Sequence, residues 1–424
     1  MNYNFDEIIN RRGSDSVKWD QYGEDVLPMW VADMDFKASP AIIKALQKRL
    51  DHGVFGYEKV PQAYFDAISS WFSRRHGWTW ITRDNVIPTT GVIAAYGACI
   101  KAFTRPGDRV IVMSPCYNAF FPVVRNNGCL VAESPLIYED GKYSIDFDSL
   151  EELASDPRTP VLLLCNPQNP VGRVWTRAEL LRVGEICVRN NVFVIADEIH
   201  CEITAPGVEY VPYGTLPSEM VLRSATCCSP TKPFNIAGIQ IANVIALDPD
   251  VVRRIDRAIN DNECCDVNVF GVTALMAAYN ESEGWLDAFR EYIWENERTV
   301  RAFLAEHLPM VTAPPLEGTY LMWLDFSALA VPQHHCCHHH DEEEHHCHHD
   351  EKEEGHCCHH RFPVPLGFSR AFGEYLRKNG LALCDGPLYG EYTGEGFMRL
   401  NLACPRATLL DGLHRLSTAI TRLG

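Results

Sequence analysis

Between about residues 108 and 247, short apolar runs alternate with segments whose apolar residues recur at helical spacing. The runs are nearly continuous rather than alternating, which is typical of strands in a sheet that helices cover on both faces. This pattern predicts an α/β domain with a mostly parallel sheet, which binds ligands at the carboxyl ends of its strands. We predict strands at Asp108–Ser114, Cys129–Ser134, Pro160–Cys165, Val192–Asp197, Val221–Thr226 and Gln240–Leu247.

One helix between these strands has a clear start. Thr176 precedes Arg177–Asn191, and Glu179 stands three residues later, which together predict a capping box. A second helical pattern, Ala94–Phe103, follows Thr89-Thr90-Gly91-Val92-Ile93.

After about residue 250 the pattern changes to long helices and few strands, which predicts a smaller α+β C-terminal domain. Its elements are predicted at Trp285–His307 (helix), Tyr320–Phe326 (strand), Ser369–Asn379 (helix, closed by Gly380), Phe397–Ala403 (strand) and Ala407–Leu423 (helix). We divide the chain into an N-terminal segment (1–45) that packs on the small domain, a large domain (46–285) and the small domain (286–424).

Residues 334–360 differ in composition from the rest of the chain. They hold twelve of the 17 histidines, five cysteines and eight acidic residues in alternating blocks. Apart from the cysteines they offer no apolar residue to bury, which predicts a disordered surface insertion in the small domain.

The bulk composition excludes several classes of protein. The formal net charge of −18 disfavours nucleic acid and anionic membranes as partners. The first residues lack the basic and apolar regions of a signal peptide, and no apolar run reaches transmembrane length. The 17 cysteines are scattered, which indicates reduced, buried thiols such as Cys165 and Cys187 in a cytoplasmic protein.

Lys232 and Asp197 are the first candidate functional pair. Lys232 lies in Ser229-Pro230-Thr231-Lys232-Pro233-Phe234-Asn235, further along the chain than the predicted strand that ends at Asp197. Pyridoxal phosphate (PLP) chemistry needs a lysine that forms a Schiff base with the cofactor and a carboxylate that keeps the pyridine nitrogen protonated. A lone loop lysine is usually a surface residue, but other parts of the same site accompany this one.

Those other parts concern the ring and the phosphate of the cofactor. Asn169 follows a predicted strand and can bond the ring's phenolic oxygen, although Asn-Pro-x-Asn-Pro alone indicates a turn. Tyr117 can stack on the ring, or it is an ordinary core aromatic. The expected phosphate donors are the backbone N–H groups of Gly91, Val92 and Ile93 at a helix start and the hydroxyls of Ser229 and Thr231.

Arg399 is the candidate for binding a substrate carboxylate. It stands inside an apolar strand, where a cation is unfavourable unless it is paired, and a guanidinium can bind a carboxylate through two hydrogen bonds. Arg406 is a weaker candidate for the same task.

These motifs resemble fold-type I PLP enzymes of the class I/II aminotransferase superfamily, and more narrowly the cystathionine β-lyases of the MalY/PatB type. The resemblance covers nearly the whole chain apart from the insertion. The segments that carry it are Pro28-Met29-Trp30-Val31-Ala32-Asp33-Met34-Asp35-Phe36, Asp197-Glu198-Ile199-His200, Lys232-Pro233-Phe234-Asn235-Ile236-Ala237-Gly238 and Arg399-Leu400-Asn401-Leu402-Ala403-Cys404-Pro405-Arg406.

The resemblance implies a role for each matching residue. Lys232 is the Schiff-base lysine, Asp197 partners the pyridine nitrogen, and Arg399 binds substrate. Asn169 and His200 lie at the ring oxygen, Tyr117 stacks on the ring, and Ala32 and Asp33 contact substrate. Tyr57 reaches the phosphate of a neighbouring subunit, which implies a homodimer. The chain departs from the pattern at Gln240, where many aminotransferases carry a phosphate-binding arginine, and in the insertion.

The implied reaction is carbon–sulfur β-elimination from cystathionine or a related cysteine conjugate, and the Trp30–Phe36 segment carries this narrower assignment. An aminotransferase would use the same residues and remains the alternative. A third hypothesis is a metal-buffering or regulatory protein with an inert PLP fold. No defined metal site is predicted; adventitious metal binding would fall to His334, His335, Cys336, Cys337 and His338.

Overall fold

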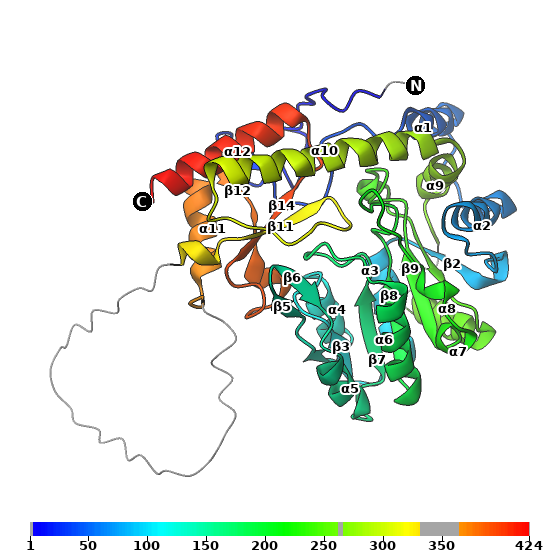
Figure 1. The fold of residues 1–424 in the computed structure, drawn as a ribbon. Helices are drawn as coiled ribbons and strands as arrows, with labels where there is room; N and C mark the ends of the chain where they lie inside the picture. Colours follow the sequence, from blue (N-terminus) through cyan, green and yellow to red (C-terminus); the bar gives the residue numbers. More distant parts are fainter. Residues whose placement is uncertain (1–2, 262–265, 331–363, 424) are drawn as a thin grey trace, which may run out of the picture.

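The computed structural model describes residues 3–261, 266–330 and 364–423 (Figure 1). In Figure 1 a large sheet with its helices fills the lower part of the molecule, and the long helix α10 (Glu283–His307) crosses above it. None of the helices in these ranges is both long and apolar enough to cross a membrane.

Within the described ranges the large sheet has seven strands in the order β2-β10-β9-β8-β7-β3-β4. Only β10 runs antiparallel to its neighbours in that sheet. The strands are β2 (Val86–Thr89), β3 (Arg109–Val112), β4 (Leu130–Glu133), β7 (Val161–Cys165), β8 (Phe193–Asp197), β9 (Ser224–Cys228) and β10 (Ala242–Ile245).

Helices cover both faces of this sheet, because alternate strand residues point to opposite sides. Val110 and Val112 of β3 pack in the hydrophobic cluster of one face, whereas Ile111 packs in that of the other. The first face is covered by α3 (Val92–Phe103), α4 (Phe120–Asn126) and α8 (Pro249–Asn260), and the second by α5 (Phe147–Ser155), α6 (Arg177–Arg189) and α7 (Ser218–Val221).

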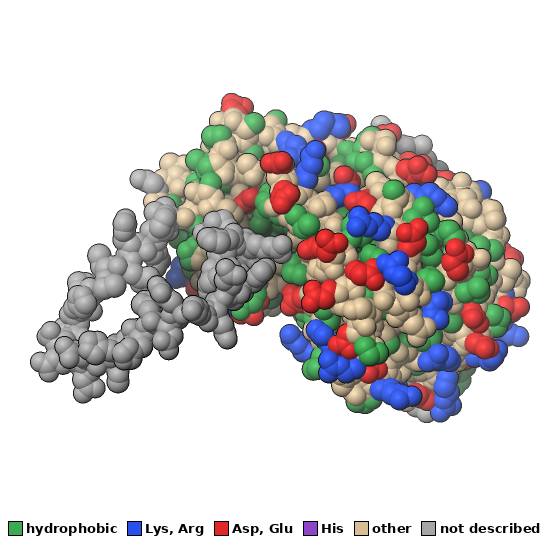
Figure 2. All heavy atoms as spheres, turned by 60° about the horizontal axis from the view of Figure 1, so that its bottom comes forward, with side chains coloured by type: hydrophobic (Ala, Val, Ile, Leu, Met, Phe, Trp, Pro, Cys, Tyr) green, Lys and Arg blue, Asp and Glu red, His purple; other side chains and the backbone are tan. Residues whose placement is uncertain are grey.

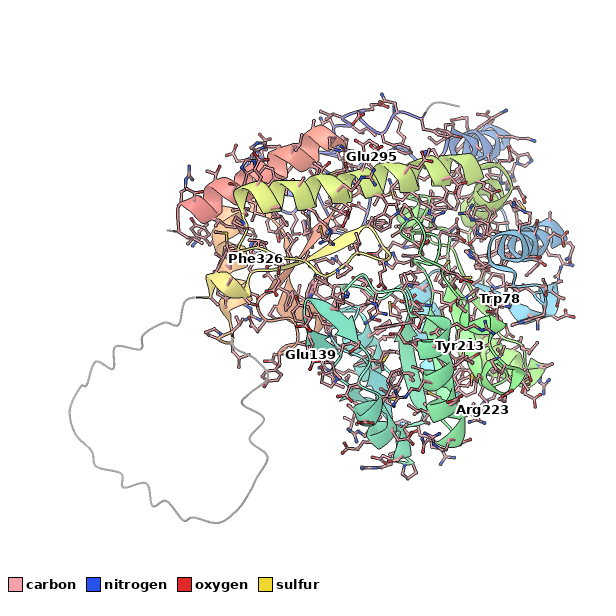
Figure 3. The ribbon with its side chains drawn as sticks, viewed as in Figure 1. Trp78, Glu139, Tyr213, Arg223, Glu295 and Phe326 are labelled. Atoms are coloured by element: carbon pink, nitrogen blue, oxygen red, sulfur yellow. The ribbon has the colours of Figure 1, made fainter. Side chains whose placement is uncertain are left out.

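A smaller antiparallel sheet, β11 (Leu321–Asp325), β14 (Phe397–Asn401) and β13 (Cys384–Asp385), packs with α10, α11 (Phe368–Lys378) and α12 (Arg406–Thr421). The N-terminal β1 (Leu27–Pro28) pairs with β12 (Leu381–Ala382). Figure 3 places Glu295 and Phe326 in this upper part, and Trp78, Tyr213 and Arg223 around the large sheet. The remaining elements are α1 (Pro40–His52), α2 (Gln62–His76) and α9 (Val269–Glu281), and the hairpin β5 (Ile137–Glu139) with β6 (Lys142–Ser144).

The α/β fold class predicted from the sequence is confirmed, and so is the capping box of Thr176 and Glu179. The strand predicted at Val221–Thr226 was wrong at its start: Val221 ends α7, and β9 begins only at Ser224. The domain division stays a prediction, and its boundary at 285 falls within the first turn of α10. The predicted insertion, 334–360, lies outside the described residues.

The face shown in Figure 2 carries acidic and basic side chains that are mixed together. The ten cysteines that the structure describes are buried and free of disulfide bonds, Cys165 and Cys187 among them.

Candidate active site

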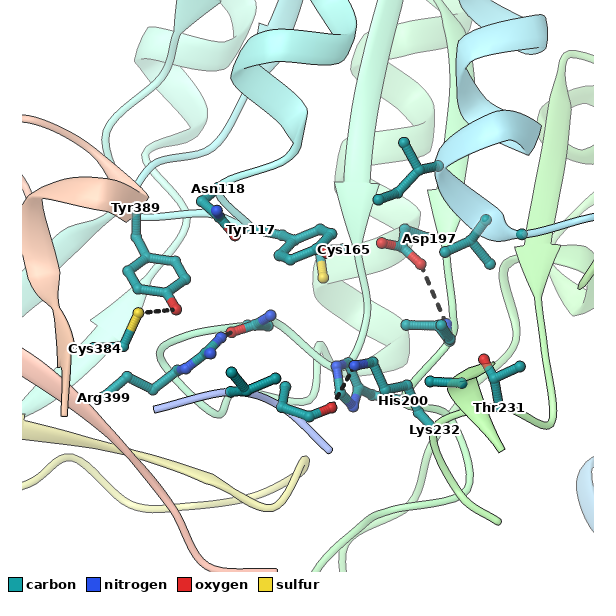
Figure 4. A pocket seen from close by; sticks show the side chains of 18 of the residues that line it. Tyr117, Asn118, Cys165, Asp197, His200, Thr231, Lys232, Cys384, Tyr389 and Arg399 are labelled. Atoms are coloured by element: carbon teal, nitrogen blue, oxygen red, sulfur yellow. Dashed lines mark hydrogen bonds between the residues drawn. The ribbon is translucent and has the colours of Figure 1, made fainter. Parts of the chain in front are cut away.

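A cavity of about 580 Å³ lies at the carboxyl end of the parallel strands (Figure 4). Asp197 is the last residue of β8, Lys232 lies in the turn after β9, and Arg399 comes from β14 of the smaller sheet. The side chains of all three line this one space with Tyr117 and His200. The fold therefore brings together residues that are far apart in the sequence, at the edge where α/β sheets bind ligands.

The Asp197 carboxylate is buried and accepts the backbone N–H of Ile199 at 3.3 Å. Burial disfavours its charged form and raises its pKa to about 7, although the nearby Lys232 acts in the opposite direction. A cation placed against this carboxylate would offset that penalty. Asp197 thus suits a positively charged ring nitrogen.

The amine of Lys232 donates a hydrogen bond to the carbonyl of Ala32. Burial and the neighbouring cation Arg399 lower the pKa of Lys232 to about 8. A substantial fraction of the amine is neutral near physiological pH, as both a nucleophile and a base require.

The Arg399 guanidinium is buried, with its residue 4% exposed. Nη1 donates to Oδ1 of Asn169 and Nη2 to the carbonyl of Trp30, both at 3.0 Å, and the guanidinium lies over the Tyr389 ring. Nε has no partner among the described residues. No carboxylate of the described chain pairs with this cation, so it is available to a substrate carboxylate.

The opposite end of the cavity is built from a helix start. Gly91 is the N-cap of α3, and the backbone N–H groups at this start have no partner within the helix. Thr231 lines the cavity beside it. Ser229 does not: its hydroxyl lies 2.7 Å from that of Thr231 and donates to the carbonyl of Ile241 at 2.6 Å. Ser229 therefore positions Thr231.

The segment Met29–Phe36, here called the N-terminal strap, forms one wall of the cavity through Trp30, Val31 and Ala32. Two asparagine side chains hold it in place. Asn401 Nδ2 donates to the carbonyls of Val31 and Asp33, and Asn235 bonds the N–H and carbonyl of Met34 and the carbonyl of Phe36. The strap is thus tied to β14 and to the Lys232 turn.

Besides Ser229, two more residues predicted for the site, Asp33 and Tyr57, lie outside the cavity. Asp33 pairs with Arg11 at 2.6 Å instead of facing the cavity. Tyr57 is fully exposed in the loop between α1 and α2. Arg406 also lies elsewhere, where it bonds Asn296 and pairs with Glu295, which Figure 3 labels on α10.

The ring of His200 is buried, and its Nδ1 has no partner among the described residues. Burial, together with the cations Lys232 and Arg399, lowers its pKa well below the ordinary value, so the ring is neutral. A neutral imidazole with an unpaired nitrogen suits a ring oxygen as neighbour.

Sequence reasoning gave no site role to several lining residues, because apolar periodicity does not show which residues of a segment face a cavity. Tyr389 is one: its hydroxyl donates to Cys384 Sγ at 3.1 Å, while its ring supports Arg399. Gln240 also lines the cavity, and the sequence distinguishes it only by its departure from the family pattern. The missed residues are Val17, Trp30, Val31, Thr90, Ala94, Asn118, Cys165, Ile199, Ala237, Cys384, Leu388 and Tyr389.

One cluster in the described chain, His76, Cys201 and Glu202, has the spacing of a metal site. Its carboxylate is already occupied, because Trp71 and Arg75 donate to Glu202 and His76 lies 2.7 Å from it. It is better described as a buried ion-pair network. The insertion residues named for adventitious metal lie outside the described residues.

This cavity has the groups that PLP-dependent enzymes need. A lysine, a buried carboxylate and a helix start line it, together with an arginine that has no carboxylate partner in the described chain. The model of the family "Aminotransferase class I and II" matches residues 24–416, and the chain belongs to this family. The resemblance predicted from the sequence is thereby confirmed.

Three relatives illustrate the similarity. Cystathionine β-lyase PatB of Bacillus subtilis (strain 168) is 39% identical, over 99% of this chain and 100% of its own. Protein MalY of Escherichia coli (strain K12) is 30% identical, with 99% of each chain covered. The crystal structure of cystalysin from Treponema denticola, which contains pyridoxal 5'-phosphate, superposes with a TM-score of 0.89, 32% identity and full coverage of both chains.

Proposed function

We propose that the protein is a PLP-dependent carbon–sulfur β-lyase. It converts L-cystathionine, or a related cysteine S-conjugate, to pyruvate, ammonia and a thiol. The observation that carries this proposal is the N-terminal strap: the segment on which the narrower resemblance to the lyases rests forms a wall of the cavity, and its Ala32 carbonyl accepts a hydrogen bond from the Lys232 amine. The full-length similarity to PatB supports the same reaction.

The cavity fits the cofactor at each of its polar ends. Asp197 would hold the pyridine nitrogen, His200 and Asn169 would lie at the ring oxygen, and Tyr117 would cover the ring. The start of α3 and Thr231 would bind the phosphate. Bound PLP supplies an aldehyde for attachment of amines and a ring that stabilises negative charge at the substrate Cα.

The chain's own residues carry the remaining steps. Arg399 binds the substrate carboxylate and so orients the Cα–H bond. Lys232 would take the Cα proton, and the sulfur would then leave from Cβ as a thiolate, which becomes the thiol when it takes up a proton. Burial lowers the pKa of Lys232 to about 8, so a fraction of the amine is neutral near pH 7 and can accept this proton.

An assay of pyruvate release from L-cystathionine, with and without an added oxo acid, separates the lyase from the aminotransferase. We expect release at the same rate under both conditions, because elimination consumes no acceptor. Turnover that strictly requires the oxo acid would identify an aminotransferase and refute the proposal.

The buried Asp197 carboxylate predicts an unusual pH dependence of stability in the cofactor-free protein. Between about pH 4 and pH 7 the folded chain keeps a proton on Asp197 that the unfolded chain releases, since the ordinary pKa is 3.8. Its stabilising contribution therefore falls as pH rises through this range. Cofactor-free Asp197→Asn should be more stable than wild type at pH 8, by about 2–4 kcal/mol, and similar to it near pH 4.

Thermal unfolding at the two pH values measures this difference. Glu202→Gln is the control of opposite sign. Despite its burial, His76 and Arg75 lower the pKa of Glu202 to about 2, so this variant should lose stability at pH 8. A cofactor-free Asp197→Asn protein that is no more stable than wild type at pH 8 would contradict the account of Asp197.

The proposal includes a cytoplasmic homodimer with its active sites at the subunit interface. The exposed apolar side chains Val54, Phe55 and Tyr57 share the loop between α1 and α2 and would be covered by a second subunit. Gln240 lines the cavity but carries no charge to bind the phosphate. Tyr57 of a partner subunit would therefore supply a further contact to the phosphate. The buried free thiols suit a reducing compartment.

A further inference from the structure

A second cavity, of about 370 Å³, adjoins the first. The two share Asn118 and Leu388 in their walls. Figure 4 shows Asn118 on the Tyr389 side of the first cavity, away from Lys232. The second cavity therefore adjoins the first on the side away from Lys232, the side toward which the distal part of a substrate held by Arg399 and Lys232 would extend.

The second cavity lies between the edge of the large sheet and the smaller sheet. Arg125 comes from α4, Glu133 ends β4, Arg370 lies on α11 and Asp385 ends β13. Glu391 follows the turn that carries Leu388. Five of the ten lining residues are charged, and both signs are present, whereas only three of the residues that line the first cavity are charged.

The two cations are available to a ligand. Arg125 and Arg370 are exposed, and neither guanidinium forms an ion pair or hydrogen bond with a residue that the structure describes. Because both cations line the cavity, they suit a carboxylate, which a guanidinium binds with strong, charge-assisted hydrogen bonds.

The acidic side can accept a cation. Asp385 is half-buried, and Arg377 lies 3.3 Å from its Oδ1. Burial nevertheless raises its pKa, although Arg377 and Arg370 act against the shift. A further positive group beside Asp385 would be favourable, and Glu133 and Glu391 add negative charge to the lining of the same cavity.

A ligand with a carboxylate and an ammonium group matches this lining, and a neutral alkyl chain does not. We infer that the second cavity binds the leaving thiol of the substrate, and that it selects thiols with an amino-acid head group. Arg125 and Arg370 bind the carboxylate, while Asp385 and Glu391 face the ammonium. This inference rests on the proposed β-lyase function. It assigns the leaving half of the substrate to the second cavity, since the active-site cavity holds the other half.

The test uses the holoenzyme and three cysteine conjugates of nearly equal length. L-cystathionine carries both charges on its leaving half, S-(3-carboxypropyl)-L-cysteine lacks the ammonium, and S-propyl-L-cysteine lacks both. The variant is Arg125→Met with Arg370→Met, and the control is Arg105→Met, an exposed arginine that lines neither cavity.

For the double variant we expect kcat/KM to fall by about tenfold or more for the two carboxylate-bearing conjugates. It should stay within about threefold for S-propyl-L-cysteine, and the control should match wild type on all three. Asp385→Asn should lower kcat/KM for L-cystathionine but not for S-(3-carboxypropyl)-L-cysteine.

Equal losses on all three conjugates, or no loss on any, would overturn the inference. Wild-type enzyme that prefers S-propyl-L-cysteine to L-cystathionine would overturn it too, while leaving the β-lyase function in place. Absence of pyruvate from all three conjugates would instead refute the β-lyase function, and the inference with it.

Discussion

Replacement of Lys232 by alanine should lower pyruvate release from L-cystathionine by on the order of 10³-fold or more. The variant loses both the amine that attaches the cofactor and the base that takes the Cα proton, and no second lysine lines the cavity in the described chain. Purified Lys232→Ala should also lack the visible absorption band of lysine-bound PLP.

Lys142→Ala is the matched control, since this exposed lysine lies on the β6 hairpin away from the cavity. Its activity and absorption should equal those of wild type. The far-ultraviolet circular dichroism of Lys232→Ala should match wild type as well, because the Lys232 side chain forms only one hydrogen bond within the described chain, to Ala32. A folded Lys232→Ala protein with a normal band would contradict its assignment.

Replacement of Arg399 by methionine should lower kcat/KM for L-cystathionine by on the order of 10²–10³-fold. The buried guanidinium has an unpaired Nε and no carboxylate partner in the described chain, so the substrate supplies its counter-charge. The loss should be largest in kcat/KM, because the guanidinium binds the substrate carboxylate. A smaller loss in the binding of PLP alone should accompany it, because Arg399 also holds Asn169 and the strap carbonyl of Trp30.

Arg406→Met provides the comparison within the same sequence motif. Arg406 begins α12 and contacts Asn296 and Glu295, outside the cavity. We expect this variant to keep kcat/KM within about threefold of wild type and to lose about 1 kcal/mol of stability. Similar kinetic losses in both variants would mean that Arg399 does not bind substrate through its own guanidinium.

The sequence predicted the large sheet well because its central strands are buried on both faces and read as continuous apolar runs. The sequence placed the start of one strand wrongly, at Val221. Pro217 is the N-cap of the short helix α7, which ends at Val221, and the strand begins only at Ser224. An apolar run alone does not distinguish a buried helical turn from a strand. Tertiary packing decides between a helical turn and a strand. Here Met220 of α7 packs in the hydrophobic cluster between the sheet and the helices α5 and α6.

The candidate site was predictable where a polar residue stands at or just after the end of an apolar strand. Asp197 ends β8, and Asn169 follows β7. Their functional roles stay predictions, although the structure places both at the cavity. The clamp that Asn235 and Asn401 form on the strap was not predictable, because side-chain to backbone bonds between distant segments leave no periodic signal. The same holds for the charged second cavity, which unites residues from α4, β4, α11 and β13.

The central claim is that this site eliminates a thiol from Cβ without an acceptor. The most direct measurement is the stoichiometry of products from L-cystathionine over many turnovers, in the absence of any oxo acid. The account predicts pyruvate, ammonia and homocysteine in equal amounts, with no decline in rate as turnovers accumulate. Reaction that stops after about one turnover per active site, with the amino group retained on the cofactor, would contradict it and identify a transaminase.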